Sequence, residues 1–270
     1  MLFDLHVHTK FSDGEFSPEE VVNKAFDKGL NGIAITDHDS VDGVYFAIKQ
    51  GEIYKNFYVI PGIEFGTISN NEEVHILGYF IDYNNKELLN ITQKLRSSRI
   101  ERANKILYKL NEMGVTIDIT DVLAYSSSDN IGRPHIAKAL LEKNYVKSIQ
   151  EAFELYLNRG KPAYFERYHL SIDETIDLIQ SVGGICILAH PGLLKDKSII
   201  DDAIKKGIDG IECIHSKHTR MEIEIYKNIA KANGLIITGG SDYHGDSDIL
   251  GDFCVDLEDI PKMKERVLNV

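Results

Sequence analysis

The chain has ten histidines, and six of them stand at or near the ends of segments that alternate apolar and polar residues as β-strands do. Asp13, Glu64 and Asp242 occupy similar positions. His6 and His8 alone could be two ordinary surface histidines, although on a strand both rings would point to one face. Nine nitrogen and oxygen ligands together suffice for two or three divalent metals, and imidazole with carboxylate suits Mn, Fe or Zn. The candidate ligands are His6, His8, Asp13, His38, Glu64, His75, His190, Asp242 and His244.

Strands and helices that alternate along the chain would bring these residues together. The hydrophobic pattern predicts strands at residues 2–9, 32–39, 57–65, 73–80, 183–190, 207–215 and 235–244. Ser17 and Glu20 predict the capped start of a helix that ends near Gly29, and Ser171 and Glu174 predict the start of another. This order is typical of an α/β fold with a mostly parallel sheet, whose strand ends meet on the face where active sites are built.

Residues 84–165 depart from the alternation, because they are rich in helix formers and contain no convincing strand. Helical spacing of apolar residues predicts helices at 85–113, 136–143 and 149–157, with Gly114 ending the first. We therefore expect two units. Residues 1–83 and 166–270 would form the α/β unit, and residues 84–165 would form a helical insertion that caps the strand ends.

The composition is that of a globular protein, with 43% hydrophobic and 27% charged residues and a net charge of −12. No apolar run is long enough to span a membrane, and a strand-like segment begins too early for a signal peptide. Three cysteines in mostly apolar surroundings suggest reduced thiols and a cytoplasmic protein. The acidic charge disfavours a broad nucleic-acid surface, so we expect no binding of duplex DNA.

Seven short motifs follow one another in a recognisable order. They are residues 3–9 (FDLHVHT), 11–14 (FSDG), 35–39 (ITDHD), 61–64 (PGIE), 73–79 (EVHILGY), 189–191 (AHP) and 240–244 (GSDYH). Together they resemble the polymerase and histidinol phosphatase (PHP) family, over nearly the whole chain and at all nine candidate ligands. The resemblance implies an α/β fold, namely a distorted seven-stranded (β/α) TIM-like barrel with a helical insertion, and a trinuclear metal site.

The resemblance also implies how the ligands are shared. His6, His8, Glu64 and Asp242 would hold one metal, Glu64 would bridge to a second held by His75 and His190, and Asp13, His38 and His244 would hold a third. Three divalent ions against three carboxylates would leave the pocket positive by about three charges, so it would attract a phosphate in an acidic protein. A hydroxide bridging the metals would attack phosphorus in line with the leaving oxygen. Asp37 and Asp39 could orient ligand rings, although Asp39 could equally cap a helix.

The insertion contains residues 131–136 (IGRPHI), which resemble the Gly-Arg-Pro-His segment of one PHP branch. That branch comprises nucleoside 3′,5′-bisphosphate phosphatases and exoribonucleases that act on the 5′ ends of short RNA, and the segment contributes there to phosphate binding. Arg133 and His135 are therefore candidate substrate residues. Arg99 and Arg102 share a helix face and could line the approach of a second phosphate, or could simply be solvated. His218, or less favourably His215, could touch substrate or protonate the leaving group.

The sequence thus favours a metal-dependent phosphoesterase that uses two or three Mn, Fe or Zn ions on a small nucleotide or a short RNA end. A histidinol-phosphate phosphatase is one alternative, and a PHP module that binds metal without catalysis is another. Metal identity, the choice between phosphatase and exoribonuclease, and the oligomeric state stay open at this point.

Overall fold

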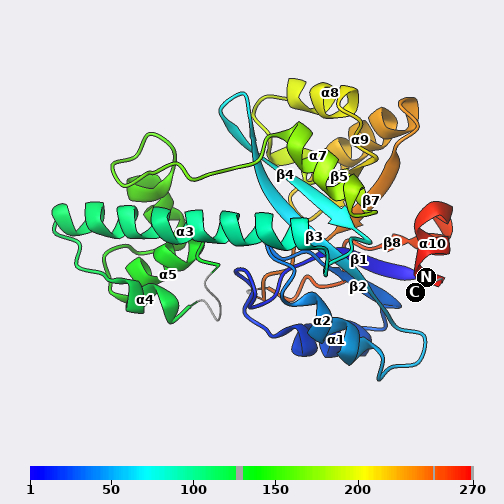
Figure 1. The fold of residues 1–270 in the computed structure, drawn as a ribbon, viewed down its shortest axis with the longest axis horizontal. Helices are drawn as coiled ribbons and strands as arrows, with labels where there is room; N and C mark the ends of the chain where they lie inside the picture. Colours follow the sequence, from blue (N-terminus) through cyan, green and yellow to red (C-terminus); the bar gives the residue numbers. More distant parts are fainter. Residues whose placement is uncertain (126–129, 246, 269–270) are drawn as a thin grey trace.

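The computed structural model describes residues 1–125, 130–245 and 247–268, and its strands form one curled sheet (Figure 1). The strand order is β7-β6-β5-β4-β3-β2-β1-β8. The strands are β1 (Leu2–Val7), β2 (Gly32–Ile35), β3 (Tyr58–Ser69), β4 (Glu72–Tyr79), β5 (Ile185–Leu188), β6 (Gly210–His215), β7 (Ile236–Gly240) and β8 (Val255–Asp256). The expected α/β barrel is confirmed, and β8, which the sequence did not predict, adds a short antiparallel pairing to β1.

The sheet nearly closes where the end of β7 meets β1. The backbone N–H of Asp242 donates to the carbonyl of His6 at 2.9 Å, and the N–H of His8 donates to the carbonyl of Tyr243 at 2.9 Å. Gly240 makes this approach possible, because a Cβ atom there would lie 2.3 Å from the Cβ of His6. Closure therefore brings the first and last candidate ligands of the chain side by side.

Strand β4 runs antiparallel to both β3 and β5, whereas the other neighbours among β1–β7 are parallel. The cause is the two-residue turn between β3 and β4, where Asn70 and Asn71 both have positive φ (49° and 63°). Asparagine tolerates this conformation, and such a turn folds the chain back as a hairpin. His75 consequently lies in the first half of its strand and still faces the same end of the barrel as ligands from the ends of parallel strands.

Ten α-helices surround the strands or build the insertion in the described part of the chain. Their bounds are α1 (Pro18–Asp27), α2 (Val44–Gly51), α3 (Lys86–Glu112), α4 (Ile119–Leu123), α5 (Arg133–Glu142), α6 (Ile149–Ala152), α7 (Ile172–Ser181), α8 (Ser198–Lys205), α9 (Arg220–Ala232) and α10 (Pro261–Leu268). A π-helical turn, Phe153–Leu157, follows α6. The predicted capping boxes at Ser17 and Ser171 both form. Helices α2, α4 and α10 were not predicted from the sequence.

Helix α3 extends from the barrel to the far end of the insertion, where α4 and α5 pack beside it (Figure 1). Its N-cap is Asn85, whose side chain accepts hydrogen bonds from the first turn, and the chain turns at Gly114, which has a φ of 83°. The insertion has a hydrophobic core of its own, formed by α3 residues such as Ile106 and Leu110 against Leu140 of α5. Between residues 84 and 165 no strand occurs in the described part.

Within the described residues, no helix has both the length and the apolar character needed to cross a bilayer.

Candidate metal centre

Glu64, on β3, lies at the centre of the candidate site and is fully buried. One carboxylate oxygen, Oε2, lies 3.3 Å from His6 Nε2, 3.2 Å from His8 Nε2 and 2.9 Å from His38 Nδ1. The other oxygen, Oε1, lies 2.8 Å from His75 Nδ1 and 3.0 Å from His190 Nε2. One carboxylate therefore faces two separate groups of histidines, as a carboxylate that bridges two metals would.

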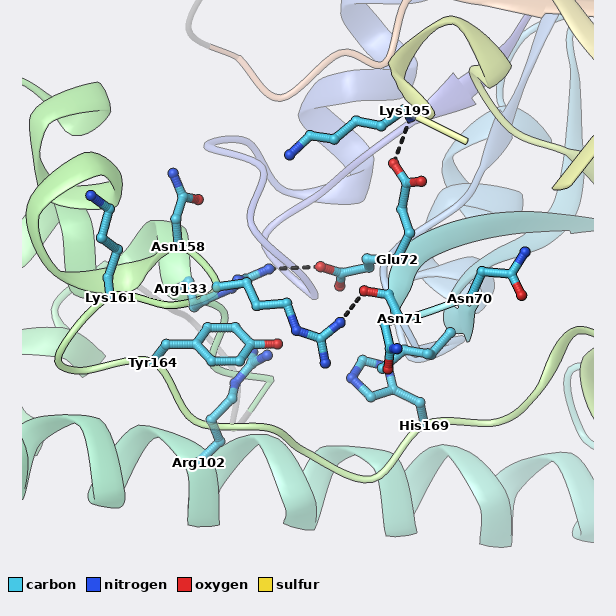
Figure 2. A pocket seen from close by; sticks show the side chains of 13 residues that line it. Asn70, Asn71, Glu72, Arg102, Arg133, Asn158, Lys161, Tyr164, His169 and Lys195 are labelled. Carbon is cyan, nitrogen blue, oxygen red and sulfur yellow. Dashed lines mark hydrogen bonds and ion pairs between the residues drawn. The ribbon is translucent and has the colours of Figure 1, made fainter. Parts of the chain in front are cut away.

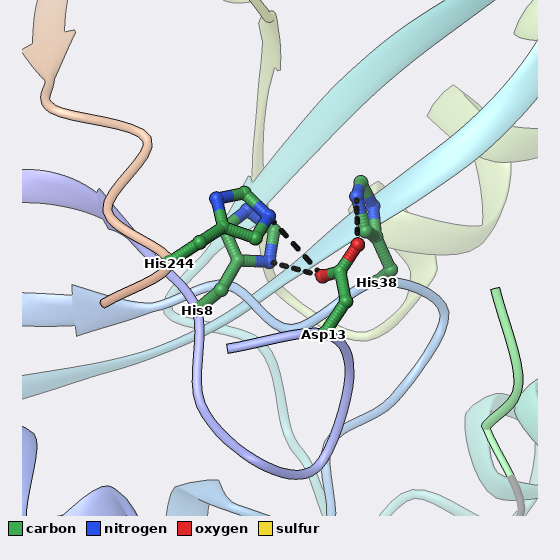
Figure 3. A group of neighbouring side chains, drawn as sticks. All are labelled: His8, Asp13, His38 and His244. Carbon is green, nitrogen blue, oxygen red and sulfur yellow. Dashed lines mark ion pairs between the residues drawn. The ribbon is translucent and has the colours of Figure 1, made fainter. Parts of the chain in front are cut away.

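Asp13 is the centre of a third group of ligand atoms, next to the group around Glu64 Oε2 (Figure 3). Its Oδ1 atom lies 3.1 Å from His244 Nε2 and 3.8 Å from His8 Nδ1, and its Oδ2 atom lies 3.9 Å from His38 Nε2. The rings of His8 and His244 stack with centroids 4.1 Å apart. The structure therefore gathers ligand atoms of His8, Asp13, His38 and His244 closely enough for one cation.

Asp242, which follows β7, completes the group around the other side of His6 and His8. Its Oδ1 atom lies 3.4 Å from His6 Nε2 and 3.2 Å from His8 Nε2. Together with Glu64 these residues form a second set with cation-holding geometry. All nine residues singled out in the sequence thus lie in one continuous cluster at one end of the barrel.

Hydrogen bonds outside the cluster determine which nitrogen of each ring faces inward. The Ser12 hydroxyl donates to Asp37 at 2.6 Å, so it can only accept from His8 Nδ1, which lies 3.3 Å away. His244 Nδ1 lies 2.9 Å from the backbone carbonyl of Asp242, so this nitrogen must donate. In both rings Nδ1 therefore carries the proton, and the lone pair of Nε2 points into the cluster.

When these rings are neutral, the cluster therefore places hydrogen-bond acceptors directly opposite one another. His6 Nε2 and His8 Nε2 are 3.1 Å apart, and both face Glu64 Oε2. Glu64 Oε2, Asp13 Oδ1 and His38 Nδ1 are buried and have no well-aligned hydrogen bond within the described residues. Buried lone pairs in this arrangement need a positive charge between them, and the nitrogen and oxygen donor set fits divalent transition metals.

The shifted pKa values of Glu64 and His75 also indicate that positive charge stabilises the cluster. Burial alone would raise the pKa of Glu64, but the rings of His38, His75 and His6 outweigh burial and hold this pKa well below its usual value. Burial alone would lower the pKa of His75, and the carboxylates of Glu64 and Glu73 raise it to about 10 instead. Without metal, protons would therefore partly occupy the cluster.

Four arginines lie beside this centre, and we call Arg99, Arg102, Arg133 and Arg167 the arginine cluster. The first three border the cavity next to the centre, and the side chain of Arg167 is fully buried. Arg99 Nε lies 2.8 Å from the buried Asp39, and Arg167 lies 3.0 Å from the same carboxylate. Arg133 lies 2.7 Å from Glu73. Asp39 thus anchors arginines, and it has no hydrogen bond to a ligand ring among the described residues. Arg167 was not predicted from the sequence, because nothing around it forms a motif.

Arg102 differs from the other three, since it is 6% exposed and has no hydrogen bond or ion pair with any described residue. Burial, together with the nearby charges of Arg99 and Arg167, lowers the pKa of its guanidinium group. The side chain rises from α3 toward Tyr164 and Arg133 (Figure 2). Four guanidinium groups face the carboxylates of Asp39 and Glu73, which leaves an excess of two positive charges in a largely buried region.

Two adjoining cavities share Glu73, Arg102 and Arg133. The inner cavity, of about 150 Å³, is bounded by Asp13, His38 and His75 of the candidate metal centre and also by Arg99. The outer cavity, of about 630 Å³, continues between the β3–β4 hairpin and the insertion (Figure 2). Lys161 and His169 also line the outer cavity.

The other two predicted substrate residues are buried histidines. His135 is 1% exposed, and its Nδ1 atom accepts from the N–H of Gly132 at 3.0 Å, so Nε2 carries the proton and has no partner among the described residues. Burial lowers the pKa of His135 to about 4. Both ring nitrogens of His218 are bonded to main chain, one to the carbonyl of Cys213 and one to the N–H of Gly192. His218 therefore needs to move before it can reach a substrate.

A curled α/β barrel with clustered histidines and carboxylates at one end defines a class of enzyme, namely hydrolases that act through bound divalent metals. The family model described as the PHP domain matches residues 4–228. The chain belongs to the PHP domain family.

Relatives of known name agree with this class. The chain is 29% identical to a 3′,5′-nucleoside bisphosphate phosphatase of Chromobacterium violaceum, covering 89% of this chain and 86% of the relative. It is 31% identical to a 5′-3′ exoribonuclease of Haemophilus influenzae, covering 90% and 89%. It is 30% identical to a phosphoribosyl 1,2-cyclic phosphate 1,2-diphosphodiesterase of Eggerthella lenta, covering 91% and 95%.

A solved structure from Bifidobacterium adolescentis, described as a proposed metal-dependent phosphoesterase, superposes with a TM-score of 0.89 at 29% identity. The superposition covers 98% of this chain and 96% of that one. The protein is thus a phosphoesterase of the metal-dependent type.

Proposed function

We propose that the nine clustered residues hold two or three divalent ions, of Mn, Fe or Zn, and that the protein hydrolyses a phosphate ester of a small nucleotide. The observation that carries the proposal is the position of Glu64, whose two buried carboxylate oxygens face two separate groups of histidine nitrogens. When bound, such metals polarise a phosphate and lower the pKa of a bound water toward neutrality.

The chain's own residues would bind and orient the substrate. Arg102 and Arg133 border the inner cavity next to Asp13 and His75. Their guanidinium groups can therefore bind phosphate oxygens of a substrate whose scissile ester faces the metals. Arg99 would act from the cavity wall, where Asp39 holds it in place. The excess of two positive charges in the arginine cluster matches the charge of one phosphate dianion.

This charge supports a substrate with a second phosphate. In a nucleoside 3′,5′-bisphosphate, one phosphate would lie at the metals and the other at the arginine cluster, and the products would be the nucleoside 5′-monophosphate and phosphate. The 5′ end of a short RNA offers the same pair of groups. Histidinol phosphate fits less well, because its ammonium group would face arginines. A cytoplasmic location is part of the proposal, and the three free cysteines support it.

The test is phosphate release by Mn²⁺-loaded protein from a 3′,5′-bisphosphate, and nucleotide release from a 5′-phosphorylated oligoribonucleotide. Histidinol phosphate and a cyclic phosphate serve as comparison substrates. Turnover of either nucleotide substrate well above the comparison substrates is expected. Metal binding without turnover of any of the four would contradict the proposal and would favour a module that binds metal without catalysis.

A further inference from the structure

Strand β6 supplies none of the nine candidate ligands, yet Glu212 and His215 on this strand are fully buried against the cluster. Residues three apart on a regular strand point to opposite faces. Here the register of β6 against β7 shifts between Glu212 and Ile214, which adds one residue to β6 as a β-bulge. Because of this bulge both side chains reach the centre of the barrel.

Glu212 contacts two candidate ligands that come from different strands. Its Oε1 atom lies 3.0 Å from His6 Nδ1, and its Oε2 atom accepts from the backbone N–H of His190 at 2.9 Å. A carboxylate that already accepts from a backbone amide presents acceptor oxygens to the ring, so His6 Nδ1 carries the proton. The lone pair of His6 Nε2 then faces His8 and Glu64, where a metal would lie.

The hydrogen bond to His190 acts at a conformationally costly position. His190 has a φ of 27°, in the left-handed region that side chains other than glycine rarely adopt. The contact with Glu212 holds the backbone in this conformation, which directs His190 Nε2 to within 3.0 Å of Glu64. One buried carboxylate thus orients a ligand ring on β1 and a ligand backbone after β5.

His215 makes the corresponding contact to the ligand after β7. Its Nδ1 atom accepts from the backbone N–H of Lys217 at 3.1 Å, so the proton is on Nε2. This Nε2 atom lies 3.5 Å from Asp242 Oδ2, within ion-pair distance, although the two atoms are not aligned as a hydrogen bond. Asp242 also has a positive φ, of 57°. The other carboxylate oxygen, Oδ1, is left to face His6 and His8.

His6, Glu212 and His215 are also close enough together to suggest a further cation site. The hydrogen bonds argue against that alternative. His6 Nδ1 and His215 Nε2, the ring atoms of this group, both carry protons, whereas a metal ligand must offer a lone pair.

We propose that β6 is the positioning strand of the centre: Glu212 fixes the tautomer of His6 and the backbone of His190, and His215 aligns Asp242. Both residues act through ligands and touch neither metal nor substrate. The inference rests on the proposed function, since it assumes that His6, His190 and Asp242 bind metal.

The first test is Mn²⁺ binding to metal-free protein by isothermal titration calorimetry. Glu212→Gln keeps the shape of the side chain but offers an amide donor to His6, and we expect it to weaken metal binding about 10- to 100-fold. His215→Phe keeps a ring and removes the polar Nε2 atom beside Asp242, so it should weaken binding as well. The matched control is Asp209→Asn, because Asp209 also accepts an N–H bond from β5, at 2.9 Å from Cys186, but at the opposite end of β6.

The second test is a spectroscopic signature that loss of fold stability would not produce. In Zn²⁺-saturated protein labelled with ¹⁵N-histidine, His6 should show a protonated Nδ1 and a metal-bound Nε2, and so should the Asp209→Asn variant. Glu212→Gln should lose the protected Nδ1 proton. If wild type binds metal and Glu212→Gln keeps both its affinity and this signal, the positioning role is wrong and the metal centre stands. If wild type binds no metal, the proposed function fails and this inference fails with it.

Discussion

Replacing Arg102 with methionine should make the protein more stable and a poorer enzyme at once. Arg102 is buried near Arg99, Arg133 and Arg167 and pairs with none of the residues that the structure describes, so its charge destabilises the substrate-free fold. Methionine fills a similar volume without the charge. Since exchanging buried charge for apolar volume often stabilises a protein by about 1–4 kcal/mol, the metal-free variant should melt roughly 2–4 °C higher for each kcal/mol gained.

The same substitution removes a charged donor from the second phosphate. Hydrogen bonds to charged groups contribute about 1.5–3 kcal/mol, which corresponds to a loss of roughly 10- to 150-fold in kcat/KM. Steady-state hydrolysis of a 3′,5′-bisphosphate should show this loss, whereas a simple aryl phosphate, which has no second phosphate, should be hydrolysed almost as before.

The matched control for Arg102 is Arg96→Met on the same helix, because Arg96 pairs with Asp42 and lines neither cavity. This control should change neither the melting temperature nor the preference for the bisphosphate by a comparable amount. A lower melting temperature of Arg102→Met than of wild type, or an equal loss of activity on both substrates, would refute this role of Arg102.

Three other perturbations have defined outcomes. Glu64→Gln should abolish tight Mn²⁺ binding and lower kcat/KM by more than about 100-fold, since both groups of histidines lose their shared carboxylate. Calorimetry would measure the binding and steady-state kinetics the activity. Near-normal Mn²⁺ binding would contradict the prediction. Chelation should lower the melting temperature of the Mn²⁺-loaded protein, because each site filled at 100 times its Kd contributes about 2.7 kcal/mol; an unchanged melting curve would oppose a bound metal. Burial lowers the pKa of His135 from 6.5 to about 4, so its neutral form stabilises the fold above pH 6.5 and this stability is lost as the pH falls from 6.5 toward 4. Urea unfolding of metal-free His135→Gln should therefore depend less on pH in that window than wild type does, and parallel profiles would exclude the effect.

The candidate ligands could be predicted from the sequence because each one stands at a position that local patterns define. His6 and His8 are two residues apart on a strand, which places both rings on one face. The direction of β4 was not predicted, although the Asn70-Asn71 turn carries the signal for a hairpin. A search for two-residue turns between strand patterns would have found it.

Side-chain contacts between distant parts of the chain could not be predicted from local sequence patterns. Asp39 was expected to orient a ligand ring or cap a helix, but it pairs with Arg99 and Arg167, which are both far away in the sequence. Arg99 meets it only after α3 packs beside the barrel. Glu212 was missed for a related reason. The β-bulge that turns both Glu212 and His215 inward depends on the register with β7, and no motif in β6 itself reports that register.

The most direct test of the account is anomalous diffraction from crystals of the Mn²⁺-loaded protein. Peaks are expected on both sides of the Glu64 carboxylate, one among His6, His8 and Asp242 and one beside His75 and His190. A third peak is expected beside Asp13. No peak in the cluster, or a single peak that leaves one Glu64 oxygen without a metal, would contradict the central claim that this carboxylate bridges two ions.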